Sequence, residues 1–185
     1  MSTSTYLKHQ FLLAMPSQAD SYFGNTVTYL CEHNKDGAMG LMINRPMDLA
    51  LSSLLEQMGM GQQVDDHIRV LEGGPVSNER GFILHSDDEQ YEASLPLGNG
   101  LMLTTARHVL EAIGQGKGPK NYLVTLGYSG WGAGQLEDEM AENAWLSCPS
   151  SNEVLFQIPF ENRVQKAADS LGIDFNLMSG QAGHA

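Results

Sequence analysis

The sequence predicts an α+β protein whose sheet is mainly antiparallel. Strand-like segments outnumber helix-like ones and follow one another in local runs, which favours antiparallel pairing over a doubly wound sheet. Hydrophobic residues make up 42% of the chain and charged residues 17%, an ordinary globular balance. Because no stretch of the 185 residues resembles a linker, we expect a single domain over residues 1–185, with residues 1–8 and 178–185 loose.

The N-terminal part predicts a strand, a hairpin and a helix. Residues 9–15 form an apolar strand-like segment that Pro16 ends. Residues 26–43 predict a hairpin, because two apolar segments flank typical turn residues at 34–37. A helix should follow, with Asp48 as its N-cap. Its apolar face, at helical spacing, consists of Leu51, Leu54, Leu55 and Met58.

The middle of the chain predicts three strands and a second helix. Residues 68–71 and 80–85 have strand patterns. Residues 93–97 predict an edge strand, because their proline cannot donate to a central ladder. Thr104 or Thr105 can cap the next helix, which the glycines from residue 114 onward end.

The stretch from Gly127 to Gly134 is the most unusual in composition, with four glycines around Trp131. A strand at residues 122–126 leads into it, and a helix at residues 136–146 follows. A glycine loop before a helix can bind an anion, but the dinucleotide spacing is missing and the first helical turn is acidic. The favoured interpretation is a tight packing corner covered by the indole of Trp131.

The C-terminal part predicts one more strand and one more helix. Residues 153–158 have the pattern of a last strand, and Pro159 is placed to begin the final helix. The inward-facing residues of that helix are Phe160, Val164, Ala167, Ala168 and Leu171.

The net charge of −12 excludes one class of function. The ten basic residues are scattered along the chain and form no stripe, so direct nucleic-acid binding is not expected. Anionic membrane surfaces are disfavoured for the same reason, and no segment is long and apolar enough to span a bilayer. With two cysteines and no secretory signal, we expect a cytoplasmic protein without a disulfide framework.

Two small groups of residues could form reactive sites. Cys31 and His33 share one strand face and could form a thiol–imidazole pair, although a core cysteine is more common. His85 followed by Asp87 and Asp88 could supply metal ligands, but no close His or Cys completes a zinc set. We therefore expect no metal and no cofactor.

Arginines after apolar strands are the more promising candidates. In a protein with few basic residues, Arg45 and Arg80 should have assigned partners, either an internal carboxylate such as Glu72 or Glu137, or a ligand. The candidate ligand-binding residues are Asn44, Arg45, Arg80, His85, Trp131 and Gln135.

Several segments together resemble the YqgE/AlgH family of bacterial proteins. They cover nearly the whole chain, from about residue 7 to about residue 170. The segments are Phe11–Pro16, Tyr29–His33, Gly37–Pro46, Gly73–Val76, Arg80–His85, Gly127–Glu137 and Asn143–Leu146. The resemblance implies an α+β fold, with a complex sheet that contains a small barrel-like element and is flanked by helices. It also implies a cytoplasmic bacterial protein with no assigned catalytic activity.

Some members of that family have been described as transcriptional regulators of exopolysaccharide production. This chain has no helix-turn-helix pattern, so direct DNA contact is not expected. The favoured function is a non-catalytic regulatory module that binds a small molecule or a protein. The alternative is an enzyme of unknown reaction, with a dispersed site around Trp131, Arg45 and Arg80.

Overall fold

A computed structural model describes residues 6–105 and 107–175. The expectations for residues 1–5 and 178–185 lie outside this range. Contacts divide the chain into two compact units. Unit 1 contains residues 1–44 and 129–185, and unit 2 contains residues 45–128. No helix in the described part of the chain has the length and apolar character needed to cross a membrane.

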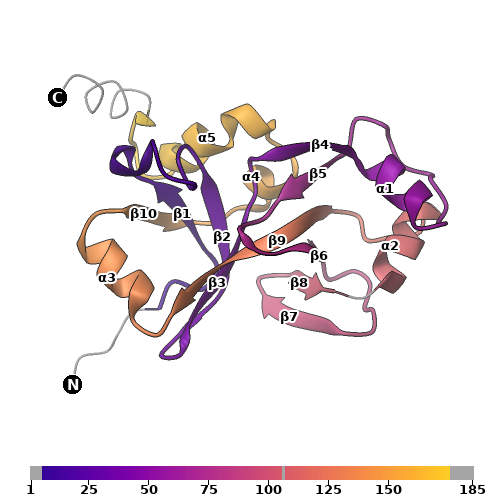
Figure 1. The fold of residues 1–185 in the computed structure, drawn as a ribbon, viewed down its shortest axis with the longest axis horizontal. Coiled ribbons are helices and arrows are strands. Elements are labelled where there is room, and N and C mark those ends of the chain that lie inside the picture. Colours follow the sequence, from indigo (N-terminus) through magenta and orange to yellow (C-terminus); the bar gives the residue numbers. More distant parts are fainter. Residues whose placement is uncertain (1–5, 106, 176–185) are drawn as a thin grey trace. The chain divides into compact units, whose positions relative to one another are not determined.

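Unit 1 is built on an antiparallel sheet with strand order β10-β1-β2-β3-β9 (Figure 1). The strands are β1 (Gln10–Ala14), β2 (Val27–Asn34), β3 (Gly37–Met42), β9 (Tyr122–Gly132) and β10 (Trp145–Pro149). Only the C-terminal end of β9, from Ser129, belongs to this unit, and it pairs with β3. The predicted hairpin at residues 26–43 is therefore confirmed as β2 and β3.

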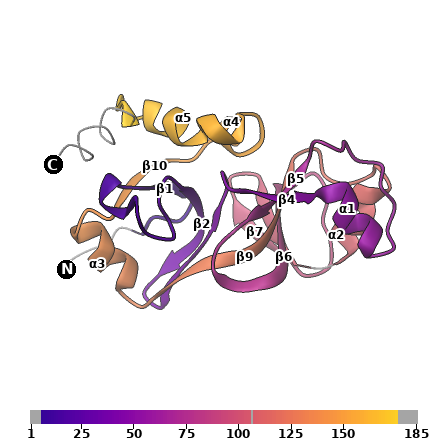
Figure 2. The same cartoon turned by 45° about the horizontal axis from the view of Figure 1, so that its top comes forward.

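The sheet of unit 1 is covered on both faces. Helix α3 (Gln135–Ala141) packs on one face, while α4 (Asn152–Phe156) and α5 (Arg163–Asp169) lie along the other side of β1 and β10 (Figure 2). Leu12 and Ala14 of β1 point into the cluster beneath α3. Phe11 and Leu13, which alternate with them along the strand, are also fully buried, which explains why Phe11–Ala14 is continuously apolar.

A buried arginine connects α5 to the sheet of unit 1. Arg163 is 4% exposed, and its guanidinium donates to the carbonyl oxygens of Ile158 and Ile43 and stacks on Phe160. Burial lowers the pKa of Arg163 to about 10. Its aliphatic stem and two carbonyl partners tie the start of α5 to the end of β3.

Unit 2 consists of a curved sheet and two helices. Its strands are β4 (Pro46–Ala50), β5 (Arg69–Glu72), β6 (Val76–Ser86), β7 (Ser94–Gly98), β8 (Leu101–Thr104) and the N-terminal part of β9. The central order is β9-β6-β8-β7, all antiparallel, while β5 runs parallel to β9 and pairs with β4. The α+β class with a mainly antiparallel sheet is therefore confirmed, and β7 is an edge strand as predicted.

Helices α1 (Leu51–Gln57) and α2 (Arg107–Gly114) lie side by side in unit 2. Their apolar faces meet Val70, Ile83 and Val124 of the sheet to form the core of this unit. The predicted apolar stripe of the first helix is correct, but Asp48 is not its N-cap. Residues 46–50 instead extend as β4 and pair with β5, so the helix begins two residues later than an Asp48 cap would place it.

Three further expectations about secondary structure are wrong. The glycine stretch is not a loop up to Gly134, because β9 continues as a strand to Gly132. The helix expected at residues 136–146 ends at Ala141, since Asn143 has a φ of 60° and the Ala144 N–H bonds back to the Glu139 carbonyl, as in a Schellman cap. Residues 153–158 are not a strand, because Ser151 caps helix α4 through the Val154 N–H.

Candidate functional site

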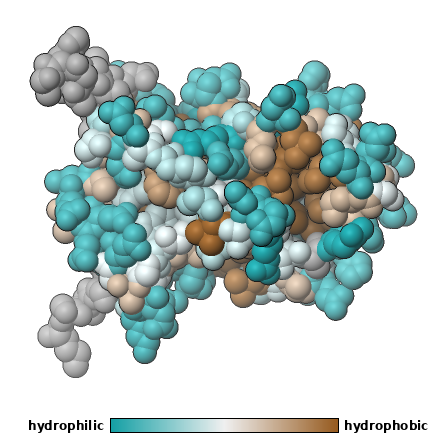
Figure 3. Space-filling view, in the orientation of Figure 1, coloured by the Kyte–Doolittle hydropathy of each residue, from teal (hydrophilic) through white to brown (hydrophobic). Residues whose placement is uncertain are grey.

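An open apolar cleft of about 190 Å³ lies in unit 2, between the sheet and the two helices. Its floor is formed by neighbouring residues of β6 and β9. Gly81 is paired with Leu126, and Ile83 with Val124. Because side chains alternate along a strand, these four positions face the same side of the sheet. Figure 3 shows apolar surface gathered on the side of unit 2 where α1 and α2 lie.

The walls of the cleft come from the helices. Leu54 of α1 and Met58, which directly follows this helix, lie four residues apart and line one wall. Leu110 of α2 also lines the cleft. Leu54, Met58 and Leu126 are only partly buried and pack on the core of the unit. The cleft is therefore an opening into the hydrophobic core, and not a separate polar crevice.

Gly81 accounts for much of the open space. A Cβ atom added at this position would meet no heavy atom within 4 Å. The φ angle of Gly81 does not lie in the positive range that favours glycine. The backbone therefore does not require a glycine here, and the missing side chain leaves the space next to Gly81 open. Glycine inside a strand often marks a place where a ligand approaches the backbone.

The rim of the cleft carries polar groups of opposite charge. Glu79 of β6 and Arg107 of α2 line it, together with the uncharged Thr105 just before α2, and all three are exposed. The Nη2 atom of Arg107 lies 3.5 Å from the Met58 carbonyl oxygen, which places the guanidinium near the end of α1. Arg107 and Met58 also line a second, polar cleft of about 190 Å³, together with Glu111 and the Gly59–Gly61 segment. The guanidinium thus stands where an apolar and a polar cleft adjoin.

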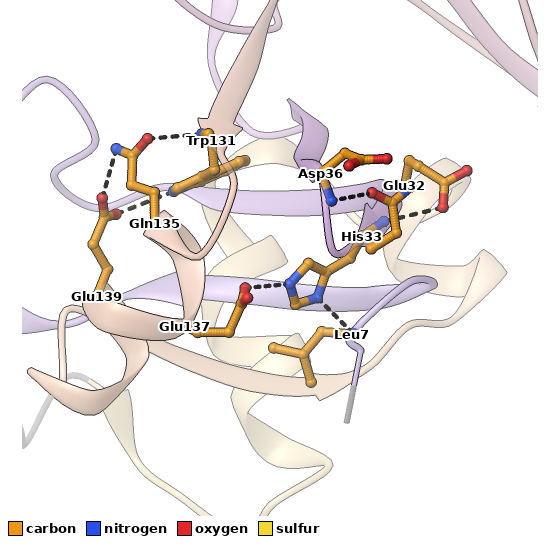
Figure 4. A network of polar contacts seen from close by, with 10 residues as sticks. Leu7, Glu32, His33, Asp36, Trp131, Gln135, Glu137 and Glu139 are labelled. Atoms are coloured by element: carbon orange, nitrogen blue, oxygen red, sulfur yellow. Dashed lines mark hydrogen bonds and ion pairs between the residues drawn. The ribbon is translucent and has the colours of Figure 1, made fainter. Parts of the chain in front are cut away.

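Trp131, which the sequence singled out, lies in unit 1 and is 6% exposed. Its ring stacks near Phe23 and meets Trp145 edge-on, with centroids 6.3 and 5.8 Å apart. Its indole N–H donates to Glu139, and Gln135 joins the Gly132 N–H to the same carboxylate (Figure 4). The expectation that Trp131 is packed is therefore confirmed.

His33 and Glu137 extend this polar network along α3. The Leu7 N–H donates to Nδ1 of His33, so Nε2 must carry the ring proton and donate to Glu137, 2.6 Å away (Figure 4). His33 is 4% exposed. Its ring nitrogens are thus occupied by structural hydrogen bonds. Burial raises the pKa of the neighbouring Cys31 thiol to about 12, so a reactive thiolate at this position is disfavoured.

Asn44, Arg45 and Arg80 also have internal partners. Asn44, in unit 1, accepts from the Val27 N–H and donates to the Asn25 carbonyl, which fixes the end of β3. In unit 2, Arg45 lies 3.9 Å from Glu72, one of the two carboxylates expected as its partner. Arg80 is exposed, and its guanidinium lies over the Phe82 ring at 5.4 Å. None of the three lines the apolar cleft.

His85 belongs to a buried chain of hydrogen bonds in unit 2. Its Nδ1 donates to the Ser86 carbonyl oxygen, which leaves Nε2 to accept from the Thr104 hydroxyl at 2.7 Å. Ser94 in turn donates to Thr104. Burial lowers the pKa of His85, which agrees with a neutral ring. Both ring nitrogens are engaged and the residue is fully buried, so the structure offers no open metal-ligand position at His85.

The cleft residues were missed from the sequence for a physical reason. The lining comes from four elements that are distant in sequence, so no local spacing marks it. One signal was present: Gly81 lies inside a strand, where the polar half of β6 gives way to its apolar half, without any need for positive φ. Arg107 could not be distinguished from other exposed basic residues, because its value lies in its position at the cleft rim.

Comparisons with known proteins agree with the resemblance noted in the sequence. A family model described as AlgH-like matches residues 11–176. A UPF0301 protein of Pseudomonas entomophila is 52% identical over 184 residues, which is 98% of this chain and 97% of the relative. A UPF0301 protein of Thioalkalivibrio sulfidiphilus is 49% identical over the full length of both chains.

Two solved structures share the fold. The solution structure of the AlgH protein from Pseudomonas aeruginosa superposes with a TM-score of 0.80 at 49% identity, covering 100% of this chain and 99% of that chain. A Corynebacterium diphtheriae protein superposes with a TM-score of 0.72 at 16% identity, covering 97% and 94%, which shows the fold alone. On the strength of the family model and the relatives near 50% identity, this chain belongs to the YqgE/AlgH family.

Proposed function

We propose that the protein is a non-catalytic regulatory module that binds a small molecule, and that the apolar cleft of unit 2 is its ligand site. The observation that carries this proposal is the open floor at Gly81, where the sheet leaves the hydrophobic core accessible between two helices. Ligand sites are typically concave, mostly apolar and edged by a few polar groups, as this cleft is.

The size of the cleft limits what it can hold. Apolar cavities of ~150 Å³ accommodate a benzene ring. A cleft of about 190 Å³ therefore suits one phenyl ring or one branched aliphatic group, not an extended chain. Binding is favoured over catalysis because, among the described residues, no His or Cys lines the cleft. An enzymatic site at Trp131 has less support, since its indole N–H is already bonded to Glu139.

The proposal is tested with benzyl alcohol as a neutral phenyl probe. Methyl NMR spectra of the full chain should show saturable shifts at Leu54, Ile83, Leu110, Val124 and Leu126 as the probe is added. Methyl groups in unit 1, such as those of Leu13 and Leu41, serve as the internal control. Shifts that are absent, or that spread evenly over both units, would argue against a ligand site in the cleft.

Gly81→Val is the matched blocking variant. A valine suits a strand and would extend into space that is empty in the structure, so the melting temperature should stay the same or rise. The same variant should abolish the methyl shifts caused by benzyl alcohol. Retained binding in a folded Gly81→Val protein would place the ligand elsewhere.

A further inference from the structure

Glu79 and Arg107 carry opposite charges and line the same cleft. Neither takes part in any ion pair within the described residues. We infer that the ligand of the cleft is a free α-amino acid with an apolar side chain, such as phenylalanine or leucine. Its side chain would occupy the floor, its carboxylate would bind Arg107 and its ammonium group would bind Glu79. This inference rests on the proposed function of the cleft.

The floor and walls of the cleft determine which apolar group the ligand can carry. Val124, Leu126 and Ile83 form an apolar floor, and Leu110 closes one side. Burying a phenyl or isobutyl group against such a surface is favourable by about 25 cal/mol for each Å² removed from water. The volume of about 190 Å³ admits one such side chain and excludes a folded peptide segment.

The charged residues at the rim determine which charged groups the ligand should carry. The guanidinium of Arg107 offers a planar set of donors that matches a carboxylate, and its hydrogen bond to the Met58 carbonyl is long at 3.5 Å. Glu79 is acceptor-only when ionised, which suits an ammonium group. An apolar acid would leave Glu79 facing a carboxylate, and an apolar amine would leave Arg107 facing an ammonium group. A zwitterion supplies a carboxylate for Arg107 and an ammonium group for Glu79.

The test compares L-phenylalanine with three analogues by calorimetry and methyl NMR. 3-Phenylpropanoate lacks the ammonium group, phenethylamine lacks the carboxylate, and N-acetyl-L-phenylalaninamide lacks both charges. L-Phenylalanine should bind at least about fivefold more tightly than each analogue, because each charge-assisted contact adds to the burial of the ring. Equal affinities for all four compounds would overturn the inference.

Charge-neutral variants assign the two contacts. Arg107→Gln should weaken the binding of L-phenylalanine and should not weaken that of phenethylamine, which has no carboxylate for Arg107 to bind. Glu79→Gln should likewise weaken the binding of L-phenylalanine and not that of 3-phenylpropanoate. The matched controls are Arg69→Gln and Glu56→Gln, which remove exposed charges of unit 2 that do not line the cleft. If the controls weaken binding as much as the rim variants do, the effect is that of net charge and the inference fails.

The two proposals fail in different ways. If benzyl alcohol shifts the cleft methyls but L-phenylalanine binds no more tightly than its three analogues, the ligand site stands and the amino-acid inference is wrong. If neither compound shifts the cleft methyls, both are wrong. If L-phenylalanine binds to Gly81→Val as well as to the unchanged protein, it binds outside the cleft, and the inference is again wrong.

Discussion

The indole nitrogen of Trp131 lies 3.1 Å from Oε1 of Glu139. The same oxygen accepts from Trp145 at 2.9 Å, so one carboxylate on α3 satisfies both indoles of the chain. This relationship makes Glu139, a half-buried acidic residue, a structural group of unit 1. It also explains why Trp131 can be buried with its polar N–H intact.

Removal of this carboxylate should destabilise the protein. Glu139→Ala leaves two buried N–H donors without their acceptor, which costs about 1–3 kcal/mol for each such group. Glu139→Gln keeps an acceptor oxygen and should cost less. Urea unfolding followed by tryptophan fluorescence measures both. Glu142→Ala, an exposed acidic residue just after α3, is the control, and an equal loss in this variant would contradict the role of Glu139.

Gly114→Ala should destabilise the protein even though alanine is the better helix former. A Cβ at this position in α2 would collide with the carbonyl oxygen of Gly61. The Gln63 N–H also bonds to the Gly114 carbonyl at 2.8 Å, so the loop has little freedom to withdraw. Overpacking of this kind costs about 1–3 kcal/mol. Gly81→Ala is the matched control.

The Gly81→Ala control should be neutral or stabilising, because the new methyl meets open space. The test compares the melting temperatures of Gly114→Ala and Gly81→Ala. Equal shifts in the same direction would show that glycine content alone, and not the contact with Gly61, governs the result.

Thr28→Val should stabilise the protein by about 1 kcal/mol. Within the described part of the chain, the Thr28 hydroxyl is fully buried and has no hydrogen-bond partner. Valine has nearly the same shape and removes this unpaired group. Thr26→Val is the opposite case, since the Thr26 hydroxyl donates to the Phe23 carbonyl at 2.6 Å. Chemical denaturation should therefore give changes of opposite sign for the two variants.

Cys31 should make stability fall at alkaline pH. Burial raises the pKa of its thiol from 9.0 to about 12 in the folded protein. Between these values the unfolded chain loses the thiol proton while the folded chain keeps it. The free energy of unfolding therefore decreases as the pH rises above 9, by up to about 1.4 kcal/mol per pH unit from this group. Below pH 9 the contribution is fully present.

The measurement compares the unchanged protein with Cys31→Ala in urea at several pH values from 8 to about 10.5. The variant should be less stable throughout, because a buried group is truncated, but its stability should fall less steeply. Parallel curves would show that the folded thiol ionises as easily as the unfolded one. Burial also raises the pKa of Tyr29, so both proteins share a part of the decline.

Local patterns were sufficient to predict much of the fold. The hairpin at residues 26–43 was recognised because its apolar segments and its turn are adjacent in sequence. The ends of elements were predicted less well. Asn143 and Ser151 carry the signals that end α3 and begin α4, yet apolar residues nearby favoured a longer helix and a strand. Short apolar segments are ambiguous between the two, and tertiary packing decided.

The candidate site was less predictable than the fold. Packing residues such as Trp131 stand out by type, whereas the cleft depends on side chains that are ordinary by type and distant in sequence. Glu79 and Arg107 become a pair only when β6 and α2 are brought together around one cleft. The ligand-binding role of six residues stays a prediction, although each of them has an internal partner. These residues are Asn44, Arg45, Arg80, His85, Trp131 and Gln135.

The pairing of β1 with β10 has a consequence for synthesis on the ribosome. Leu12 pairs with Ser147, so β1 is synthesised long before the strand that becomes its partner. Contacts of such long sequence separation form slowly, because closure of the intervening chain costs entropy. Until β10 is synthesised, one edge of β1 can pair with β2 and its other edge has no partner strand. That open edge is the apolar Phe11–Leu13 segment, and an unpaired apolar edge is prone to aggregation until β10 has been made.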